Sequence, residues 1–191
     1  MSQDELQSFL QIQEVTFSAV AGRLKVKYPH QSLRIVVPKD FHDPIITDDL
    51  QCLKDRGVLQ FNPGLKIFPM EIGCDHPVRL VIYYRELPIG FAFGNVNYSN
   101  QTIEILWMEK RNDAHEDLDH QFLGIVLDAY LTYVAVLLST GIKINKFALV
   151  GPIHGVIAYY TQSGFAYEQN YLRQCDAMVR PILIPAESLV N

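Results

Sequence analysis

Two tyrosines, Tyr159 and Tyr160, shortly precede the sequence Ser-Gly-Phe at positions 163–165. A phenol can donate a proton to a leaving group, and its ring can equally fill a position in a hydrophobic core. Adjacent residues on a helix face different sides, so we expect the two side chains to have different surroundings. The residues alone leave both roles open for Tyr160, while Tyr159 is expected to pack.

Other groups that could do chemistry have simpler interpretations. Cys74, Asp75 and His76 are adjacent in sequence, and adjacent residues rarely form a catalytic triad, so we expect a loop with a free thiol. His115 and His120 lie five apart among carboxylates and lack the i,i+4 spacing of helical metal ligands. We therefore expect an acidic, solvated surface and no metal site.

The composition indicates a folded chain of one domain, 1–191, with one sizeable core, because 49% of its residues are hydrophobic and 19% are charged. A net charge of −5 argues against a general nucleic-acid binder and favours amine-bearing partners. The sequence shows no secretion signal and no membrane span, so a soluble, cytoplasmic protein without a membrane partner is expected. Three widely spaced cysteines agree with a reducing compartment: Cys52, Cys74 and Cys175.

Spacing and punctuation predict the elements around which these residues are arranged. Ser2–Glu5 has the pattern of a capping box, and apolar residues then recur at helical spacing. The segment 58–77 is rich in proline and glycine and is expected to be irregular. The predicted elements are a helix over 4–25, a strand over 32–38, a helix over 46–57, a strand meander (78–86, 89–99, 102–110) turning at Leu87-Pro88 and Asn100-Gln101, a long helix ending before Gly141, a strand over 146–151, a helix over 153–164 and closing strands beyond it.

This order of elements predicts an α+β or mixed α/β fold. Three stretches then resemble the GNAT superfamily of acyl-CoA-dependent N-acetyltransferases over about residues 78–180. The hairpin LPIGFAFGNV (87–96) is similar to the one before the family's coenzyme-binding strand. Glu104 begins a strand that is followed by the Q-x-x-G of Gln121 and Gly124, and Tyr160 stands in the family's Tyr-x-x-x-Gly-Phe pattern.

The resemblance implies a GNAT-like fold, a central mixed sheet in which two strands splay apart to admit acetyl-CoA as the acyl donor. It implies Glu104 as the general base and Tyr160 as the acid in acetyl transfer to a primary amine, by direct attack. The amine belongs to a small molecule or to a peptide or protein. Trp107 and Met108 would line the pantetheine channel, and the pyrophosphate would lie on Gln121, Gly124, Ile125 and Val126. Residues 1–77 would build the acceptor side, and a homodimer stays open.

Two features depart from the family pattern. Val126 occupies the place of a glycine or alanine, and its side chain is expected to crowd the phosphate. Asp113 and Glu116 form a D-x-x-E box, so the long helix could begin near Asp113 and bind the amides of 121–124 in its own hydrogen bonds. The four carboxylates of residues 113–119 would in addition repel a diphosphate. The alternatives are an inactive GNAT-fold binding or interaction module and a sensor that binds acyl-CoA without turning it over. Glu104, similarly, could be a solvent-facing strand residue.

Overall fold

The protein was analysed as a computed structural model, and its structure is described for residues 2–27, 32–40, 42–59, 74, 76–172 and 175–183. Most of the predicted irregular segment 58–77 lies outside these residues. The elements follow the predicted order: α1 (Gln3–Leu24), β1 (Leu33–Val36), a π-helical turn (Ile45–Leu50) leading into α2 (Gln51–Asp55), β2 (Pro77–Tyr84), β3 (Leu87–Asn97), β4 (Thr102–Lys110), α3 (Phe122–Ser139), β5 (Lys146–Val150), α4 (Ile157–Gln162), β6 (Ala166–Leu172) and β7 (Cys175–Pro181).

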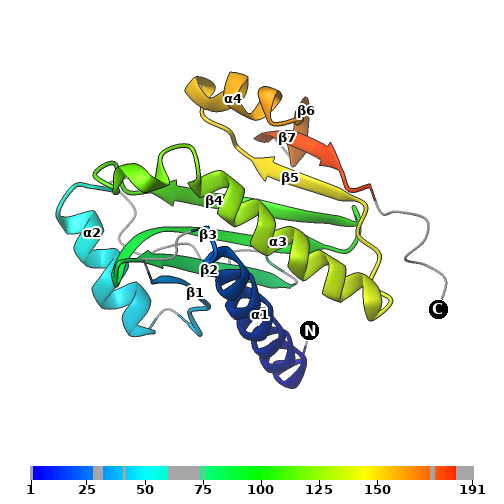
Figure 1. Ribbon diagram of the computed structural model, residues 1–191. Coiled ribbons are helices and arrows are strands. Elements are labelled where there is room, and N and C mark those ends of the chain that lie inside the picture. Colours follow the sequence, from blue (N-terminus) through cyan, green and yellow to red (C-terminus); the bar gives the residue numbers. More distant parts are fainter. Residues whose placement is uncertain are drawn as a thin grey trace.

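The seven strands form one mixed sheet in the order β1-β2-β3-β4-β5-β7-β6 (Figure 1). Among the described strands, only the β4–β5 pairing is parallel, and all other neighbours are antiparallel. The connection from β4 to β5 is α3, as a parallel pairing requires a crossover. The mixed α/β fold expected from the sequence is confirmed.

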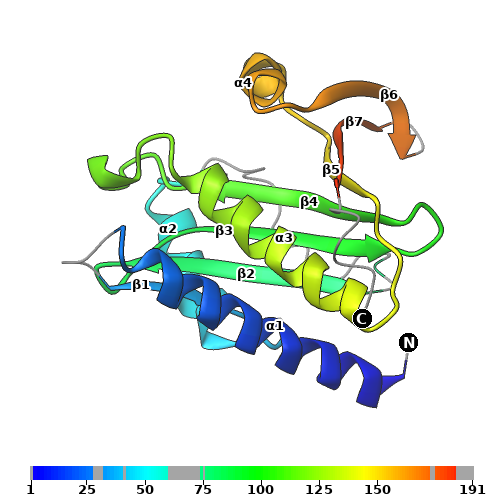
Figure 2. The ribbon, with the colours of Figure 1, turned by 45° about the vertical axis from the view of Figure 1, so that its right-hand side comes forward.

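Helices cover both faces of the sheet (Figure 2). Side chains of α1 and α3 share one large core cluster with the sheet, and Phe17 of α1 and Tyr130 of α3 are fully buried in it. The π-helical turn and α2 cover the opposite face of β2 and β3, where Leu50 packs with Val81 and Phe93. The two faces of β2 and β3 are therefore both covered, but by different helices.

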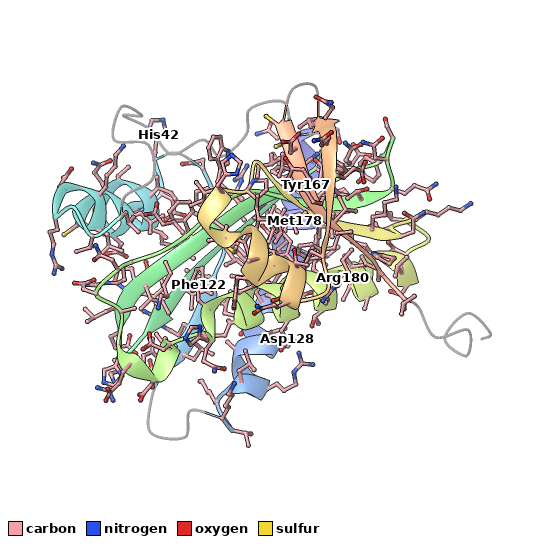
Figure 3. The ribbon with its side chains drawn as sticks, turned by 90° about the horizontal axis from the view of Figure 1, so that it is seen from above. His42, Phe122, Asp128, Tyr167, Met178 and Arg180 are labelled. Atoms are coloured by element: carbon pink, nitrogen blue, oxygen red, sulfur yellow. The ribbon has the colours of Figure 1, made fainter. Side chains whose placement is uncertain are left out.

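The N-terminal helix begins with the predicted capping box: the Ser2 hydroxyl accepts from the Glu5 amide at 3.2 Å, and the Glu5 carboxylate accepts from the Ser2 amide at 2.7 Å. Arg23 near its end binds Asp128 of α3 at 2.6 Å, and Figure 3 shows Asp128 next to α1. The helix α1 is thus fixed alongside α3.

One predicted turn lies elsewhere. The first meander turn is Arg85-Glu86, not Leu87-Pro88, which belong to β3. Arg85 and Glu86 both have positive φ, 52° and 61°, a conformation that two-residue hairpins with the strands' natural twist require. The sequence lacks the Asn-Gly signal that usually marks such a turn.

α3 is, among the described residues, the one helix with the length and mean hydropathy (1.9) of a membrane span, yet half of it is buried inside the fold. Its apolar character is that of a helix packed between a sheet and its neighbours.

Candidate functional site

The strands β4 and β5 diverge partway along β4. Their pairing runs from Thr102↔Lys146 to Ile105↔Leu149, whereas β4 continues to Lys110. Beyond Ile105, the edge of β4 that faces β5 therefore continues without pairing with β5. This is the splay that the resemblance implied.

A β-bulge marks the point of divergence. The β3–β4 register shifts between Phe93 and Gly94, so that Leu106 is the extra residue on β4, directly after the last residue paired with β5. Bulges bend and twist the strand that carries them. The bulge requires Gly94, because a Cβ at this position would lie 1.9 Å from the Glu104 carbonyl oxygen. Gly94 thus permits the local backbone that turns β4 away from β5.

The helix α3 begins at Phe122, with Gln121 as its N-cap. Between β4 and α3 the described chain forms a single 3-10 turn, Glu116–Leu118, and no α-helix. The alternative start of the long helix near Asp113 is therefore wrong. The first i→i−4 hydrogen bond of α3 runs from the Ile125 amide to the Gln121 carbonyl at 3.0 Å. The amides of residues 122–124 come before this bond and lie outside the helical hydrogen-bond pattern. These three N–H groups and the helix dipole favour an anion at this end.

The helix start differs from the D-x-x-E prediction because Asp113 is held elsewhere. Arg111 donates to both carboxylate oxygens of Asp113, at 2.8 Å through Nη2 and more closely through Nε, and Arg56 lies 3.7 Å away. The hydrogen bond from Arg111 lowers the pKa of the Asp113 carboxyl. A carboxylate bound in this way does not cap a helix.

The acidic stretch before α3 is largely ion-paired. Tyr84 donates to Asp117 at 2.7 Å and Arg85 lies 3.5 Å from the same carboxylate, while Lys110 is 3.5 Å from Asp119. Together with Asp113, three of the four carboxylates expected to repel a diphosphate thus have a cationic partner. Their net field at the start of α3 is correspondingly weaker.

The side chains near the start of α3 divide between two environments. Ile125 and Val126 are 3% and 0% exposed in the core, so the Val126 side chain does not crowd the helix terminus as expected from the sequence. Gly124 is exposed, and a Cβ there would meet no atom within 4 Å. Gln121 accepts a close hydrogen bond from Lys27, which places a cation beside the terminus.

Glu104 is buried on the opposite side of the sheet from α3. It is 2% exposed, so the solvent-facing alternative is wrong. Its Oε1 accepts from Asn97 Nδ2 at 2.9 Å and from Tyr171 OH at 2.8 Å. Oε2 accepts no hydrogen bond from the described part of the chain. A buried carboxylate with one oxygen fixed and one available can accept a proton.

Tyr160 packs from α4 against the core cluster that α3 shares with the sheet. Its ring lies 6.3 Å from Phe165, and Gly164, with φ +85°, ends the helix between them. Burial raises the pKa of the Tyr160 phenol, with Tyr159 a smaller cause, so the hydroxyl keeps its proton at neutral pH. Tyr159, expected to pack, is instead 36% exposed.

The two residues expected to line a pantetheine channel follow the bulge on β4. As neighbours on a strand they face opposite sides: Met108 packs against the α3-side core and Trp107 against the cluster under α2. Both are half-buried. They therefore flank the diverging part of β4 from its two faces.

Sequence reasoning missed Asn97 and Tyr171, the partners of Glu104, because they come from other strands and no local spacing connects them. It also missed the surroundings of His76, whose ring nitrogens lie 2.6 Å and 2.7 Å from the hydroxyls of Tyr98 and Tyr133. His76 is thus occupied in the core and is not available to Cys74, and Asp75 lies outside the described residues. Among those residues no cluster that could hold a metal occurs.

A groove of about 950 Å³ lies at the other end of the sheet from the splay. It is lined by α1, β1 and residues 39–40 and 42–45. Its acidic and basic side chains are mixed and none of the candidate residues borders it. We place the candidate site at the splay, where the buried carboxylate and the start of α3 lie.

No protein-family model matches the chain, and no curated protein sequence matches it significantly. Among solved structures, an acetyltransferase from Thermus thermophilus is 18% identical over 56% of this chain and 64% of its own, with a TM-score of 0.40. The PaiA N-acetyltransferase from Thermoplasma acidophilum, in complex with coenzyme A, is 16% identical over 56% and 61% (TM-score 0.38).

An acyl-CoA N-acyltransferase from Pseudomonas aeruginosa is 14% identical and aligns over 78% of this chain and 99% of its own, with a TM-score of 0.48. The chain spans less than two thirds of the first two of these proteins. At TM-scores below 0.5, these similarities assign no activity to this chain.

Proposed function

We propose that this protein is an acyl-CoA-dependent N-acetyltransferase that moves an acetyl group to a primary amine by direct attack. One observation carries the proposal: β4 leaves β5 directly after the buried Glu104 and Ile105, at a bulge that Gly94 permits. A mixed sheet that opens beside a buried carboxylate offers both an edge for an extended ligand and a proton acceptor.

The residues present fit a coenzyme with a diphosphate. The amides of Phe122, Leu123 and Gly124 would hold the diphosphate, the open space at Gly124 admits it, and Lys27 adds a positive charge. Met108 and Trp107 would flank the pantetheine arm along β4. When bound, acetyl-CoA supplies an acetyl group activated as a thioester.

Glu104 and Tyr160 would have complementary roles in this transfer. An amine must lose a proton to attack, and Glu104 Oε2 is the acceptor, directly or through one water. As the N–C bond forms and the C–S bond breaks, the Tyr160 hydroxyl donates its proton to the departing sulfur. Tyr160 packs on the α3 side and Glu104 on the other, so the opening between β4 and β5 would connect them.

The acceptor is an amine-bearing small molecule or a peptide or protein amine, in agreement with the acidic net charge. A cytoplasmic location is part of this proposal, and no disulfide joins the three cysteines. The features that favoured an inactive binding module are weakened, because Val126 is buried and α3 begins late enough to leave its first amides available.

The test is acetyl transfer to a panel of amines, with the wild type compared with Glu104→Gln and Tyr160→Phe. Each substitution should lower kcat by about 10²-fold or more while coenzyme affinity stays nearly unchanged. Tyr159→Phe, at an exposed neighbouring phenol, is the matched control and should leave kcat unchanged. Coenzyme binding without transfer to any amine would identify the sensor instead, and an unchanged rate for Tyr160→Phe would remove the acid assignment.

A further inference from the structure

Glu104 is held by a tyrosine from the far end of the sheet. Tyr171 belongs to β6, the edge strand, and β7 and β5 lie between β6 and β4 in the sheet order. Its hydroxyl nevertheless donates to Glu104 Oε1 at 2.8 Å. The phenol must therefore lie across two intervening strands, over the face of the sheet opposite α3.

Small residues make this possible. Ala148 is the β5 partner of Glu104, and Ala177 occupies the corresponding face of β7; both are fully buried. Tyr171 packs against the small cluster that contains these two alanines. A larger side chain at either position would fill the space in which the ring lies.

An irregularity in β6 aims Tyr171 at this space. The β6–β7 register shifts between Glu168 and Leu172, and Asn170 has φ +53°. Asp176 of β7 stabilises this conformation, since its Oδ1 accepts from the Asn170 amide at 2.9 Å and its Oδ2 accepts a close hydrogen bond from the Tyr167 hydroxyl. Figure 3 shows Tyr167 beside Met178, its partner on β7.

These contacts connect the edge hairpin to the candidate base. The hydrogen bonds from Tyr167 and Asn170 lower the pKa of the Asp176 carboxyl, so it is ionised at neutral pH. Tyr171 and Asn97 both donate to Oε1 of Glu104. Oε2 is left as the oxygen that can face the amine substrate.

We propose that Tyr171 is a positioning residue for Glu104 and that Asp176, by fixing the β6 irregularity, holds Tyr171 in place. This inference rests on the proposed function and adds a specific task for the β6–β7 hairpin. Tyr171 keeps the carboxylate in one rotamer and leaves Oε2 to accept the proton of the amine.

Tyr171→Phe retains the ring that packs on Ala148 and Ala177 and removes only the hydroxyl. It should lower kcat/KM by about tenfold, the loss expected for one hydrogen bond to a charged group. The loss should fall on kcat, with KM nearly unchanged, because the Tyr171 hydroxyl contacts the carboxylate and not the substrate. Tyr159→Phe should change neither quantity.

A double-mutant cycle tests the role of Asp176. Asp176→Asn alone should reproduce part of the defect, and in the Tyr171→Phe background it should add little, because its effect passes through Tyr171. Ala148→Val removes no polar group and should give the same loss of kcat by displacing the ring. Additive effects of Asp176→Asn and Tyr171→Phe would overturn the Asp176 part of the proposal.

A measurement without turnover separates this proposal from the proposed function. In protein labelled with ¹³Cζ-tyrosine, the resonance that Tyr171→Phe removes should shift in Glu104→Gln and in Asp176→Asn. A Tyr171 resonance that neither substitution shifts would overturn the positioning role. If those shifts occur but the wild type transfers acetyl to no amine, the proposed function fails while the contact stands. If the wild type is active and Tyr171→Phe changes neither kcat nor kcat/KM, the positioning role alone fails.

Discussion

His76 should make the stability of this protein fall steeply in mild acid. Its imidazole is fully buried, its ring lies 3.9 Å from that of Phe9, and both ring nitrogens lie against tyrosine hydroxyls. Burial lowers the pKa of His76 from 6.5 to about 4. One nitrogen can accept and the other donate only in the neutral form, because both nitrogens of the protonated ring are donors.

The sign follows from proton binding. Between pH 6.5 and about 4 the unfolded chain holds a proton on His76 that the folded chain does not, so lowering the pH favours unfolding. Above pH 6.5 the contribution of His76 to the free energy of unfolding no longer changes with pH. At about 1.36 kcal/mol per pH unit, the whole interval corresponds to about 3 kcal/mol, of which about 2 kcal/mol is lost between pH 7 and pH 5.

The assay is urea denaturation at pH 7, 6 and 5, with the wild type compared with His76→Gln, which retains a donor and an acceptor but does not titrate. The wild type should lose about 2 kcal/mol more than His76→Gln over this interval. The matched control is His42→Gln, at an exposed histidine, which should fall as steeply as the wild type. If the free energies of unfolding of the wild type and His76→Gln fall in parallel with pH, His76 is not the group that destabilises the protein in acid.

Two further predictions concern the splay and the start of α3. Gly94→Ala should lower the free energy of unfolding by about 3 kcal/mol, because the alanine Cβ would overlap the Glu104 carbonyl oxygen. Chemical denaturation measures this loss, and a loss below about 1 kcal/mol would contradict a bulge of this geometry. Lys27→Gln should weaken coenzyme binding several-fold at low salt and less at high salt, without lowering the melting temperature by more than a few degrees; a salt-independent affinity difference would argue against a charge contribution from Lys27.

Local signals predicted the elements of this fold well. The capping box at Ser2–Glu5, the three strands of the meander and the apolar face of α3 all depend on residues close in sequence, and each was found in place. The start of α3 was predicted less well, because Asp113 belongs to a helix-start pattern that its binding to Arg111 overrides. Such competition between a local pattern and a neighbouring side chain is not visible from spacing.

The site was predictable only in part. The family resemblance pointed to Glu104 and Tyr160. In the structure Glu104 is buried in polar contacts, and Tyr160 packs half-buried against the core. The hydrogen bond from Tyr171 depends on the sheet order, on two alanines and on the irregularity at Asn170, none of which has a sequence signature. Val126 was misjudged because its side chain follows the helical period into the core, away from the terminus.

Calorimetric titration of coenzyme A into the wild type and Gly124→Glu tests the central claim, that the start of α3 beside the splayed strands holds the coenzyme. Glutamate in the first turn suits the helix dipole and meets open space, so the variant should fold with unchanged or higher stability. Its charge would stand where the diphosphate is proposed to lie. If the coenzyme binds at this helix start, it binds the wild type saturably and Gly124→Glu at least about tenfold more weakly. No binding to the wild type at millimolar coenzyme, or equal affinities for the two proteins, would contradict the central claim.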